Sequence, residues 1–479
     1  MTNRGKVLII CAVGAWVAAI LLAALKLGID PVRSLIVTPL LPIAVVLIRR
    51  YPALLIAAML FVGNYKTHAA VGISLTDPTL IILGLLAATT TWEVLLIVGG
   101  VSEKTLGELF RGQKWGLVAF LLLQLTMTIS FLYTPSPQAA TEKLEHIIVF
   151  NTLAFVTPFF LFKRERDFQM LLWAVVVLAI PIAIRLIAGI SHPNDKQVFG
   201  EADVTNIGDA ELLGITVLIL LYHRFSGRFG RLMTFVALPI LSVGMVASVA
   251  RGPSLVLLLV VVLTTIVLPR GGPQVVSRRV VVAGVLLLIV GMGAALSWLQ
   301  QLPGAEVKSR QKGMELTALM HGTLDAGGTT SKRLDFFKSS ALAFSENPFA
   351  GLGLAGWGNF YYGDNRSAFP HCFVLEVAAE QGLPGLVALL GLLGAGFISL
   401  ARIRRARSQF IFVLPVFLFT ILTNMITGGI DDRIMFFWIA AVFVVDRMVI
   451  EKERKHYAGL ATPSDYLWST KALSTPYSV

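Results

Sequence analysis

This chain has few of the features that stabilise soluble or secreted proteins. Only 14% of its 479 residues are charged, and it contains two cysteines, Cys11 and Cys372. Two cysteines, one of them inside an apolar segment, exclude a disulfide scaffold and a zinc site built from cysteines. The chain also lacks a HExxH motif and an Asp-x-Asp-type carboxylate cluster, so we expect no metal site.

Apolar residues dominate instead: 56% of the chain is hydrophobic and the mean hydropathy is +0.77. Apolar runs of roughly 15–25 residues recur between Val7 and Ile450, which is the length a helix needs to cross a bilayer core. Backbone groups in lipid must be satisfied internally, which leaves helices or closed barrels, and the continuous runs favour helices. We therefore predict an all-α polytopic membrane protein.

The predicted spans number about fourteen, or about twelve if the shortest ones are discounted. They cover residues 7–27, 34–48, 52–63, 73–98, 115–133, 145–162, 168–190, 211–223, 232–250, 253–268, 280–298, 385–401, 409–427 and 433–450. Four regions follow from them: helices 1–11 within residues 1–298, a large loop with short helices at 299–384, C-terminal membrane helices at 385–450, and a tail at 451–479.

The charges indicate the orientation of these spans. The formal net charge is +12, and arginine and lysine cluster in short breaks such as Arg49-Arg50, Lys163-Arg164 and Arg402 to Arg407. If every span crosses, these breaks share one side, and cytoplasmic loops carry such an excess. Both termini and the tail are then cytoplasmic, and the large loop is extracytoplasmic. Basic residues do not alternate with aromatic ones, so we expect no nucleic-acid partner.

Three polar groups stand out on the predicted outer face. The first is the segment from Ala250 to Pro253, which separates two apolar runs and contains Arg251. Arg251 must lie at the membrane surface or in a cavity between helices, where a guanidinium is costly without a partner. Its planar fork of donors suits a phosphate group. The alternative is an interfacial arginine that extends to lipid headgroups.

The second group is Ser331-Lys332-Arg333 in the large loop. Thr330-Ser331 is predicted to cap a helix that ends near Asn347-Pro348. A basic outer loop departs from the cytoplasmic bias, although long loops escape that rule. The group either binds an anionic ligand or forms a solvated helix face.

The third group runs from Asn347 through a glycine-rich segment to His371, Glu376 and Glu380. His371 opens an apolar helical stretch, so it is predicted to lie near the outer membrane surface. Histidine suits proton transfer near neutral pH, although a lone histidine is more often structural. Farther along, Asp431-Asp432-Arg433 lies in a short outer turn, where it either contacts substrate or forms an internal ion pair.

In this order, the groups resemble the O-antigen ligase/polymerase family of bacterial envelope glycosyltransferases. The matching segments read VARGP, SKRLDFF, ENPFAGLGLAGWGNF and HCFVLEVAAEQGLPG. The N-terminal third resembles the family only in hydropathy, with one weaker sequence similarity at FLYTPSP and the following Lys143. Many members have asparagine where this chain has Cys372. Many also carry a loop arginine, for which Lys196 or Arg185 is the counterpart here.

The resemblance implies a GT-C-like enzyme that transfers a glycan from undecaprenyl diphosphate to an acceptor hydroxyl, with inversion and without metal or other cofactor. His371 would orient or deprotonate the acceptor hydroxyl, and Arg251 and Arg333 would stabilise the charge on the leaving diphosphate. Four further residues are expected to bind substrate: Lys196, Arg185, Glu380 and Asp432. The acceptor is a second lipid-linked repeat for a polymerase or lipid A-core for a ligase, and both remain open.

The resemblance also implies the bacterial inner membrane, surrounding lipids, and an active site that faces the periplasm. A chain-length regulator is left open as a further partner. The rival function is a flippase for lipid-linked oligosaccharides, which would also have about a dozen helices and buried cations. Transporters often have two related halves and a midplane site, whereas no internal repeat is evident here. A non-catalytic scaffold is a third alternative, but it would not need Arg251.

Overall fold

A computed structural model describes residues 50–65, 78–102, 105–191, 202–223, 225, 227–248, 250–267, 329–365, 368–406 and 409–460. The regular elements in these ranges are all helices, which confirms the predicted fold class. They are α3 (Pro52–Tyr65), α4 (Pro78–Val98), α5 (Leu106–Leu109), α6 (Lys114–Phe131), α7 (Pro137–Glu145), the π-helix η1 (His146–Asn151), α8 (Thr152–Leu161), α9 (Glu165–Ser191), α10 (Ala202–Tyr222), α11 (Gly227–Ala247), α12 (Arg251–Val267), α15 (Thr329–Glu346), α16 (Gly356–Tyr362), α17 (Phe373–Arg405), α18 (Val413–Ile426) and α19 (Arg433–Leu460).

Six helical stretches in the described ranges are long and apolar enough to cross a membrane. They are Thr79–Val98, Lys114–Phe131, Pro137–Leu161, Glu165–Ala188, Gly227–Ala247 and Phe373–Arg405. Shorter apolar helices occupy Pro52–Asn64, Gly252–Thr265 and Val413–Ile426. Each of these nine segments overlaps a predicted span. The predicted spans at 7–27, 34–48 and 280–298 lie outside the described residues.

Several spans begin earlier than hydropathy predicted, and two of these early starts matter for the site. The span expected at 145–162 starts at Pro137, because proline suits the first turn of a helix and α7 runs through η1 into α8. The span expected at 385–401 starts at Phe373, and α17 includes a non-helical residue, Gly382. Both early starts bring polar residues into the helical bundle, and these residues are part of the site described below.

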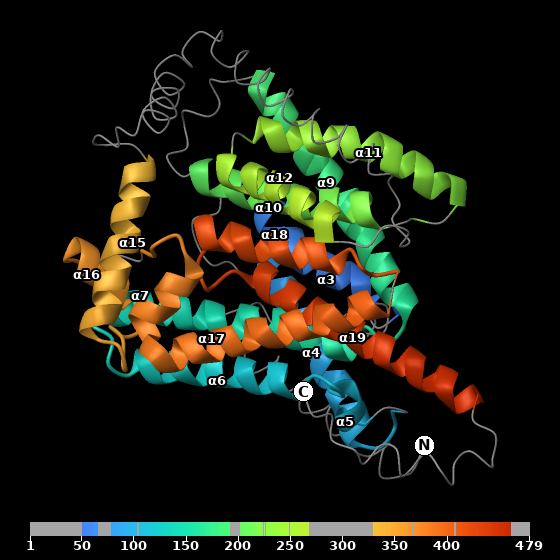
Figure 1. The fold of residues 1–479 in the computed structure, drawn as a ribbon, viewed down its shortest axis with the longest axis horizontal. Coiled ribbons are helices and arrows are strands. Elements are labelled where there is room, and N and C mark those ends of the chain that lie inside the picture. Colours follow the sequence, from blue (N-terminus) through green and yellow to red (C-terminus); the bar gives the residue numbers. More distant parts are fainter. Residues whose placement is uncertain are drawn as a thin grey trace, which may run out of the picture.

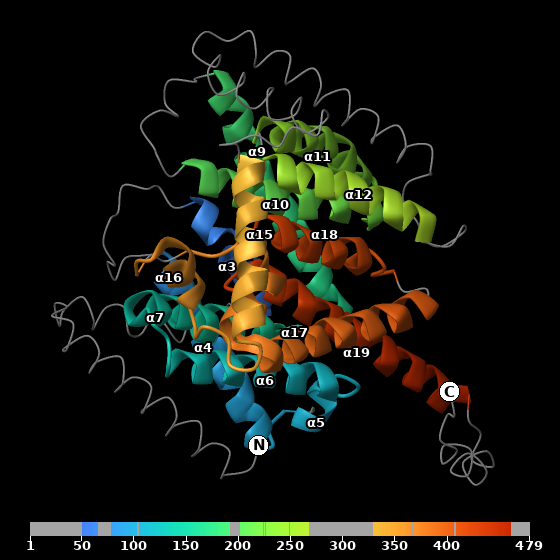
Figure 2. The same cartoon turned by 60° about the vertical axis from the view of Figure 1, so that its left-hand side comes forward.

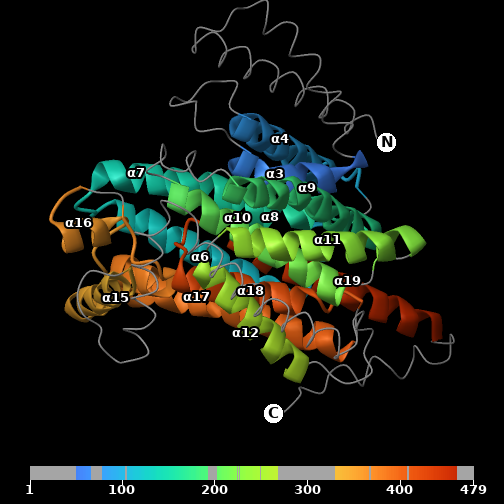
Figure 3. The ribbon, with the colours of Figure 1, turned by 90° about the horizontal axis from the view of Figure 1, so that it is seen from above.

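The helices pack side by side in one bundle. α17 lies along α6, α19 packs on α8, and α9 packs on α11 and α3. A single hydrophobic core joins the helices, and α19 contributes a continuous buried stretch from Met435 to Val445. Figures 1 and 3 show α15 and α16 together at one end of this bundle. We call this the α15 end, and Figure 2 shows α15 in front of the bundle with α16 beside it.

At the α15 end, the loop between α15 and α16 fills the kink in α17. The backbone N–H of Leu352 donates to the carbonyl of Ala379 at 2.8 Å, and that of Gly353 donates to the carbonyl of Glu380 at 3.0 Å. Beyond the kink, the N–H of Leu383 donates to the carbonyl of Pro348 at 2.7 Å. The loop thus accepts and supplies the hydrogen bonds that the break in α17 leaves open.

Glycines are required where this loop meets the kink. Gly382 has φ 64° and ψ −156°, a backbone conformation that residues with a Cβ rarely adopt. A Cβ on Gly382 would lie 2.6 Å from the carbonyl oxygen of Phe349. A Cβ on Gly351, which has φ 69°, would lie 2.5 Å from the backbone of Glu380. Backbone atoms cannot move aside, so both positions exclude larger residues.

Replacement of Gly382 by alanine is expected to destabilise the fold by more than about 1 kcal/mol, because it combines a strained φ with a backbone clash. Thermal unfolding of the purified protein in detergent measures this. Gly394→Ala is the matched control, because it lies in the same helix and its added Cβ meets nothing within 4 Å. Equal melting temperatures for the two variants would contradict the packing of the kink.

Candidate active site

His371 lies immediately before α17 and has an unusual backbone conformation. Its φ is +57°, in the left-handed region that non-glycine residues seldom occupy. Such strain persists only where neighbouring structure enforces it, and it occurs often at functional sites. Nδ1 lies 3.3 Å from the carbonyl oxygen of Thr427. A proton on Nδ1 satisfies this contact and leaves Nε2 as a proton acceptor.

Aromatic rings hold the imidazole on its other sides. The ring of Phe336, on α15, stacks on His371 with centroids 5.9 Å apart and an interplanar angle of 27°. The ring centroid of Phe369 lies 4.7 Å from that of His371, and the two rings meet at 62° in an edge-to-face arrangement. Phe336 also contacts Trp357 and Tyr361 of α16. The α15–α16 cap therefore positions the histidine, which is half-buried at the end of the bundle.

Arg333 is close enough to act on His371 electrostatically. It precedes Phe336 by three residues on α15, so both side chains lie on one face of that helix. Burial lowers the pKa of His371 below its usual value, the bond to the Thr427 carbonyl raises it in part, and the Arg333 guanidinium lowers it further. Burial also lowers the pKa of Arg333 itself. The structure thus brings two of the three predicted catalytic residues together.

The third, Arg251, begins α12 near the same point. A Cβ on the next residue, Gly252, would lie 2.7 Å from Cγ2 of Thr427, whose carbonyl contacts His371. The backbone at Arg251 is therefore adjacent to the histidine's own contact residue. The side chain of Arg251 lies outside the described residues, as does all of Lys196.

A buried ion triad lies behind the histidine. Nζ of Lys143, on α7, is 2.5 Å from Oε1 of Glu376 and 2.6 Å from Oε2 of Glu380. The lysine side chain is 10% exposed, whereas those of the glutamates are 1% and 0% exposed. Charges at this depth require partners, and each carboxylate is one helical turn from the other on α17. The triad therefore joins α7 firmly to the first turns of α17.

Glu376 extends this connection to a third segment. Its Oε2 accepts a hydrogen bond of 2.9 Å from the backbone N–H of Ile430, in the turn between α18 and α19. The same turn follows Thr427, and Asn151 of η1 donates to the carbonyl of Ile430 at 2.9 Å. The Glu376 carboxylate thus links α17, which follows His371, to the turn at Ile430. That turn comes directly after Thr427, whose carbonyl contacts His371.

Glu380 was predicted to contact substrate. It is fully buried, and its Oε2 also lies 3.4 Å from the side-chain amide of Gln381. These contacts give Glu380 a role inside the protein. Contact with substrate stays a prediction for this residue.

Arg185 belongs to a second polar cluster. Its Nη2 donates to Oδ2 of Asp209 at 2.7 Å, and its Nη1 donates to the carbonyl of Asn64 at 2.7 Å. The amide of Asn64 also donates to Oδ1 of Asp209 at 2.8 Å. Half of the Arg185 side chain remains exposed. The guanidinium is therefore fixed in position and still accessible on one side.

Asp432 sits in a third cluster, at the start of α19. Its Oδ1 accepts from the N–H of Ile434 at 2.9 Å, and its Oδ2 accepts from the Asn424 amide at 2.8 Å. The same amide lies 3.4 Å from Oε1 of Glu211. Burial raises the pKa of Asp432. The carboxylate is occupied by the cap of α19, and its predicted contact with substrate stays a prediction.

Arg433 differs from the sequence expectation. Asp432 and Arg433 of the 431–433 turn act on each other electrostatically, as expected, but no direct ion-pair contact joins them in the described part of the chain. Nε of Arg433 is buried without a hydrogen-bond partner there. The guanidinium lies over the ring of Phe150 at 5.9 Å. Its Nη2 lies 2.8 Å from where a Cβ on Gly63 would be. Gly63 directly precedes Asn64, whose carbonyl accepts a hydrogen bond from Arg185. Arg433 and Arg185 therefore contact the same end of α3.

Sequence reasoning missed several of these partners. Lys143 was predicted only as a weak similarity to the family pattern, and Arg433 only as part of a turn. Polar residues inside predicted spans, such as Glu211 and Asn424, were the available signal, because an apolar helix includes such groups only when another group satisfies them.

Comparison with known proteins agrees with the motif resemblance. Residues 235–390 match the family model described as O-antigen ligase. The match covers α11, α12, α15, α16 and the first part of α17, and so includes Arg251, Arg333 and His371. No curated protein matches the chain. The resemblance is confirmed for this third of the chain, and it supports a membrane glycosyltransferase of the O-antigen ligase or polymerase type.

Replacement of Lys143 by methionine should destabilise the protein by about 3–5 kcal/mol, because it leaves two carboxylates buried without a cation. Thermal unfolding in detergent measures the loss. Lys338→Met is the control: Lys338 is exposed on α15, and its replacement should change stability by less than about 0.5 kcal/mol. If Lys143→Met unfolds at the control's temperature, the triad contributes little to the fold.

Proposed function

We propose that the protein is an inverting, metal-independent glycosyltransferase of GT-C type that takes its glycan from undecaprenyl diphosphate. The acceptor is a sugar hydroxyl, either on a second lipid-linked repeat or on lipid A-core. The α15 end faces the periplasm, and the chain resides in the bacterial inner membrane. The family match and the apolar helices support the class of enzyme.

The arrangement of His371 is the observation that carries this proposal. It is a strained, half-buried histidine whose Nδ1 faces a backbone carbonyl, so Nε2 is the nitrogen available to a substrate hydroxyl. Burial and Arg333 keep the imidazole neutral near pH 7 by lowering its pKa. A neutral imidazole is the form that accepts a proton.

The transfer follows as one displacement. The acceptor hydroxyl oxygen attacks the anomeric carbon of the donor sugar while Nε2 of His371 takes the hydroxyl proton. The bond between the anomeric carbon and the diphosphate oxygen breaks, and its electron pair leaves with the diphosphate. Configuration at the anomeric carbon inverts, because the attack comes from the face opposite the leaving group.

Arginines supply the positive charge for the leaving group. Arg333 is beside His371, and the backbone of Arg251 is next to Thr427, so both are within reach of a diphosphate at this site. A guanidinium aimed at charge that develops in the transition state is typically worth several kcal/mol. Arg185, which pairs with Asp209 at the end of α3 and is half exposed, would contact the lipid-linked donor.

His371→Ala should reduce glycan transfer by at least about 100-fold, because it removes the general base. The assay supplies the purified protein with lipid-linked glycan and measures free undecaprenyl diphosphate and extended or transferred glycan. His223→Phe is the matched control. His223 directly follows the C-terminal end of α10 and is buried among the rings of Phe225, Phe410 and Phe412. This variant should retain both fold and transfer.

Other outcomes of this assay separate the alternatives. Unchanged turnover in a folded His371→Ala protein would remove the mechanism. Movement of the lipid-linked glycan across the bilayer without covalent change would favour the flippase. Product that forms only when lipid A-core is added would identify a ligase, and product without it would identify a polymerase.

Arg333→Gln should shift the acid side of the pH–rate profile upward. The Arg333 charge disfavours protonated His371 and so lowers its pKa. Without that charge, the pKa of His371 rises, and the inactive protonated form appears at higher pH. The profile of kcat/KM against pH, normalised to its maximum, measures this separately from the expected loss of rate. A loss of rate with an unmoved acid limb would show that Arg333 does not act on His371.

A further inference from the structure

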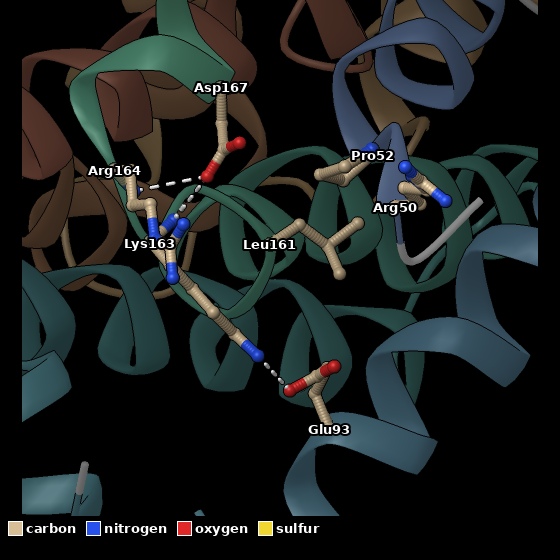
Figure 4. Close-up of a pocket in the computed structure, with 7 residues that line it drawn as sticks. All are labelled: Arg50, Pro52, Glu93, Leu161, Lys163, Arg164 and Asp167. Atoms are coloured by element: carbon tan, nitrogen blue, oxygen red, sulfur yellow. Dashed lines mark hydrogen bonds and ion pairs between the residues drawn. The ribbon is translucent and has the colours of Figure 1, made fainter. Parts of the chain in front are cut away.

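A charged pocket lies at the end of the bundle opposite His371. The continuous helix α7–η1–α8 has Lys143 near its beginning, at the α15 end, and Leu161 at its last turn, in this pocket. Seven residues from four segments line it: Arg50, Pro52, Glu93, Leu161, Lys163, Arg164 and Asp167. Figure 4 shows their side chains around Leu161. The pocket takes no part in the chemistry proposed above.

Both carboxylates in the pocket are already occupied. Oε2 of Glu93 lies 2.5 Å from Nζ of Lys163, and the Glu93 side chain is 1% exposed. Oδ2 of Asp167 accepts hydrogen bonds from the backbone N–H groups of Lys163 at 3.3 Å and Arg164 at 3.0 Å. Glu93 is therefore paired with Lys163, whereas Asp167 closes the turn before α9 and keeps its negative charge.

The two guanidiniums outnumber the carboxylate that faces them. Arg50 and Arg164 are exposed, and within the described ranges neither side chain forms an ion pair with a carboxylate. Three cations and two carboxylates leave the lining with a formal charge of +1 (3 − 2). Because Glu93 pairs with Lys163, that excess is the two arginines against Asp167. The planar donors of arginine bind phosphate oxygens in pairs.

The pocket is also next to apolar surface. Arg50 lies two residues before α3; Tyr51, which follows it, and Leu54, in the first turn of α3, are exposed at 38% and 53%. Leu161 provides an apolar floor between the two arginines. A soluble anion would use only the charged part of this surface, whereas a lipid would use both parts. Basic pockets between membrane helices are known sites for the headgroups of anionic lipids.

We propose that this pocket binds the phosphodiester of an anionic membrane phospholipid, with Arg50 and Arg164 on the phosphate and the acyl chains against Tyr51 and Leu54 at the beginning of α3. Lys163 remains paired with Glu93 and fixes the end of α8 to α4, so the pocket keeps its shape when a lipid enters. The site is independent of glycan transfer.

Native mass spectrometry of the full-length protein tests this, with phosphatidylglycerol as the probe and phosphatidylcholine as the zwitterionic comparison. The double variant Arg50→Gln/Arg164→Gln should weaken phosphatidylglycerol binding by at least about tenfold, since each arginine near a lipid phosphate contributes appreciably. Arg404→Gln/Arg405→Gln is the matched control, because it removes two exposed arginines from the end of α17. The control should bind phosphatidylglycerol like the unaltered protein.

Three results would overturn the proposal. Equal binding by the double variant and the unaltered protein would remove the two arginines from any lipid site. An equal loss in the double variant and the control would indicate general surface charge in place of a pocket. Glycerol phosphate that displaces phosphatidylglycerol at comparable concentration would show a site for a soluble anion. Thermal unfolding of both variants checks that the fold is intact.

Discussion

The α15 end of this protein depends on one buried lysine. Lys143 is held between Glu376 and Glu380 with both Nζ–Oε distances near 2.5 Å. In the membrane, an isolated charge of either sign is costly, so the three groups stabilise one another only when α7 and α17 are in register. The pairing therefore specifies how these two helices meet. The glycine kink, the loop that fills it and the position of His371 all follow from that meeting.

The strain at His371 has a physical explanation in these contacts. A left-handed backbone at a histidine is unfavourable and would relax if the flanking segments were free. On one side, Glu376 fixes the first turn of α17 to the turn at Ile430. On the other, Phe336 holds the ring, and the Thr427 carbonyl meets Nδ1. The surrounding structure thus selects one ring orientation, which in the proposed reaction would reduce the reorganisation needed for proton transfer.

The fold class and the candidate site residues could be predicted from the sequence. The buried groups that pair with some of these residues, such as Lys143, could not. Long apolar runs are sufficient evidence for membrane helices, and the motif around His371 identified Arg333 as its companion. The helical stretch was expected to open at His371, but the membrane span was predicted only from residue 385, because Glu376, Glu380 and Gln381 lower the local hydropathy. Those residues are nevertheless buried, since Lys143 pairs with the two acids. Hydropathy treats each residue alone, so a pair separated by more than 200 positions cannot be found that way.

The distribution of charge also constrains where the donor lipid can lie. The triad contains two carboxylates and one ammonium, so a diphosphate placed against it would meet repulsion. Arg333, on α15, acts on His371 electrostatically, and the backbone of Arg251 approaches from α12. In the proposed mechanism, the diphosphate would therefore lie between α12 and α15, with the anomeric carbon toward His371. The acceptor would then approach from the opposite face of the donor sugar, as the proposed inverting displacement requires.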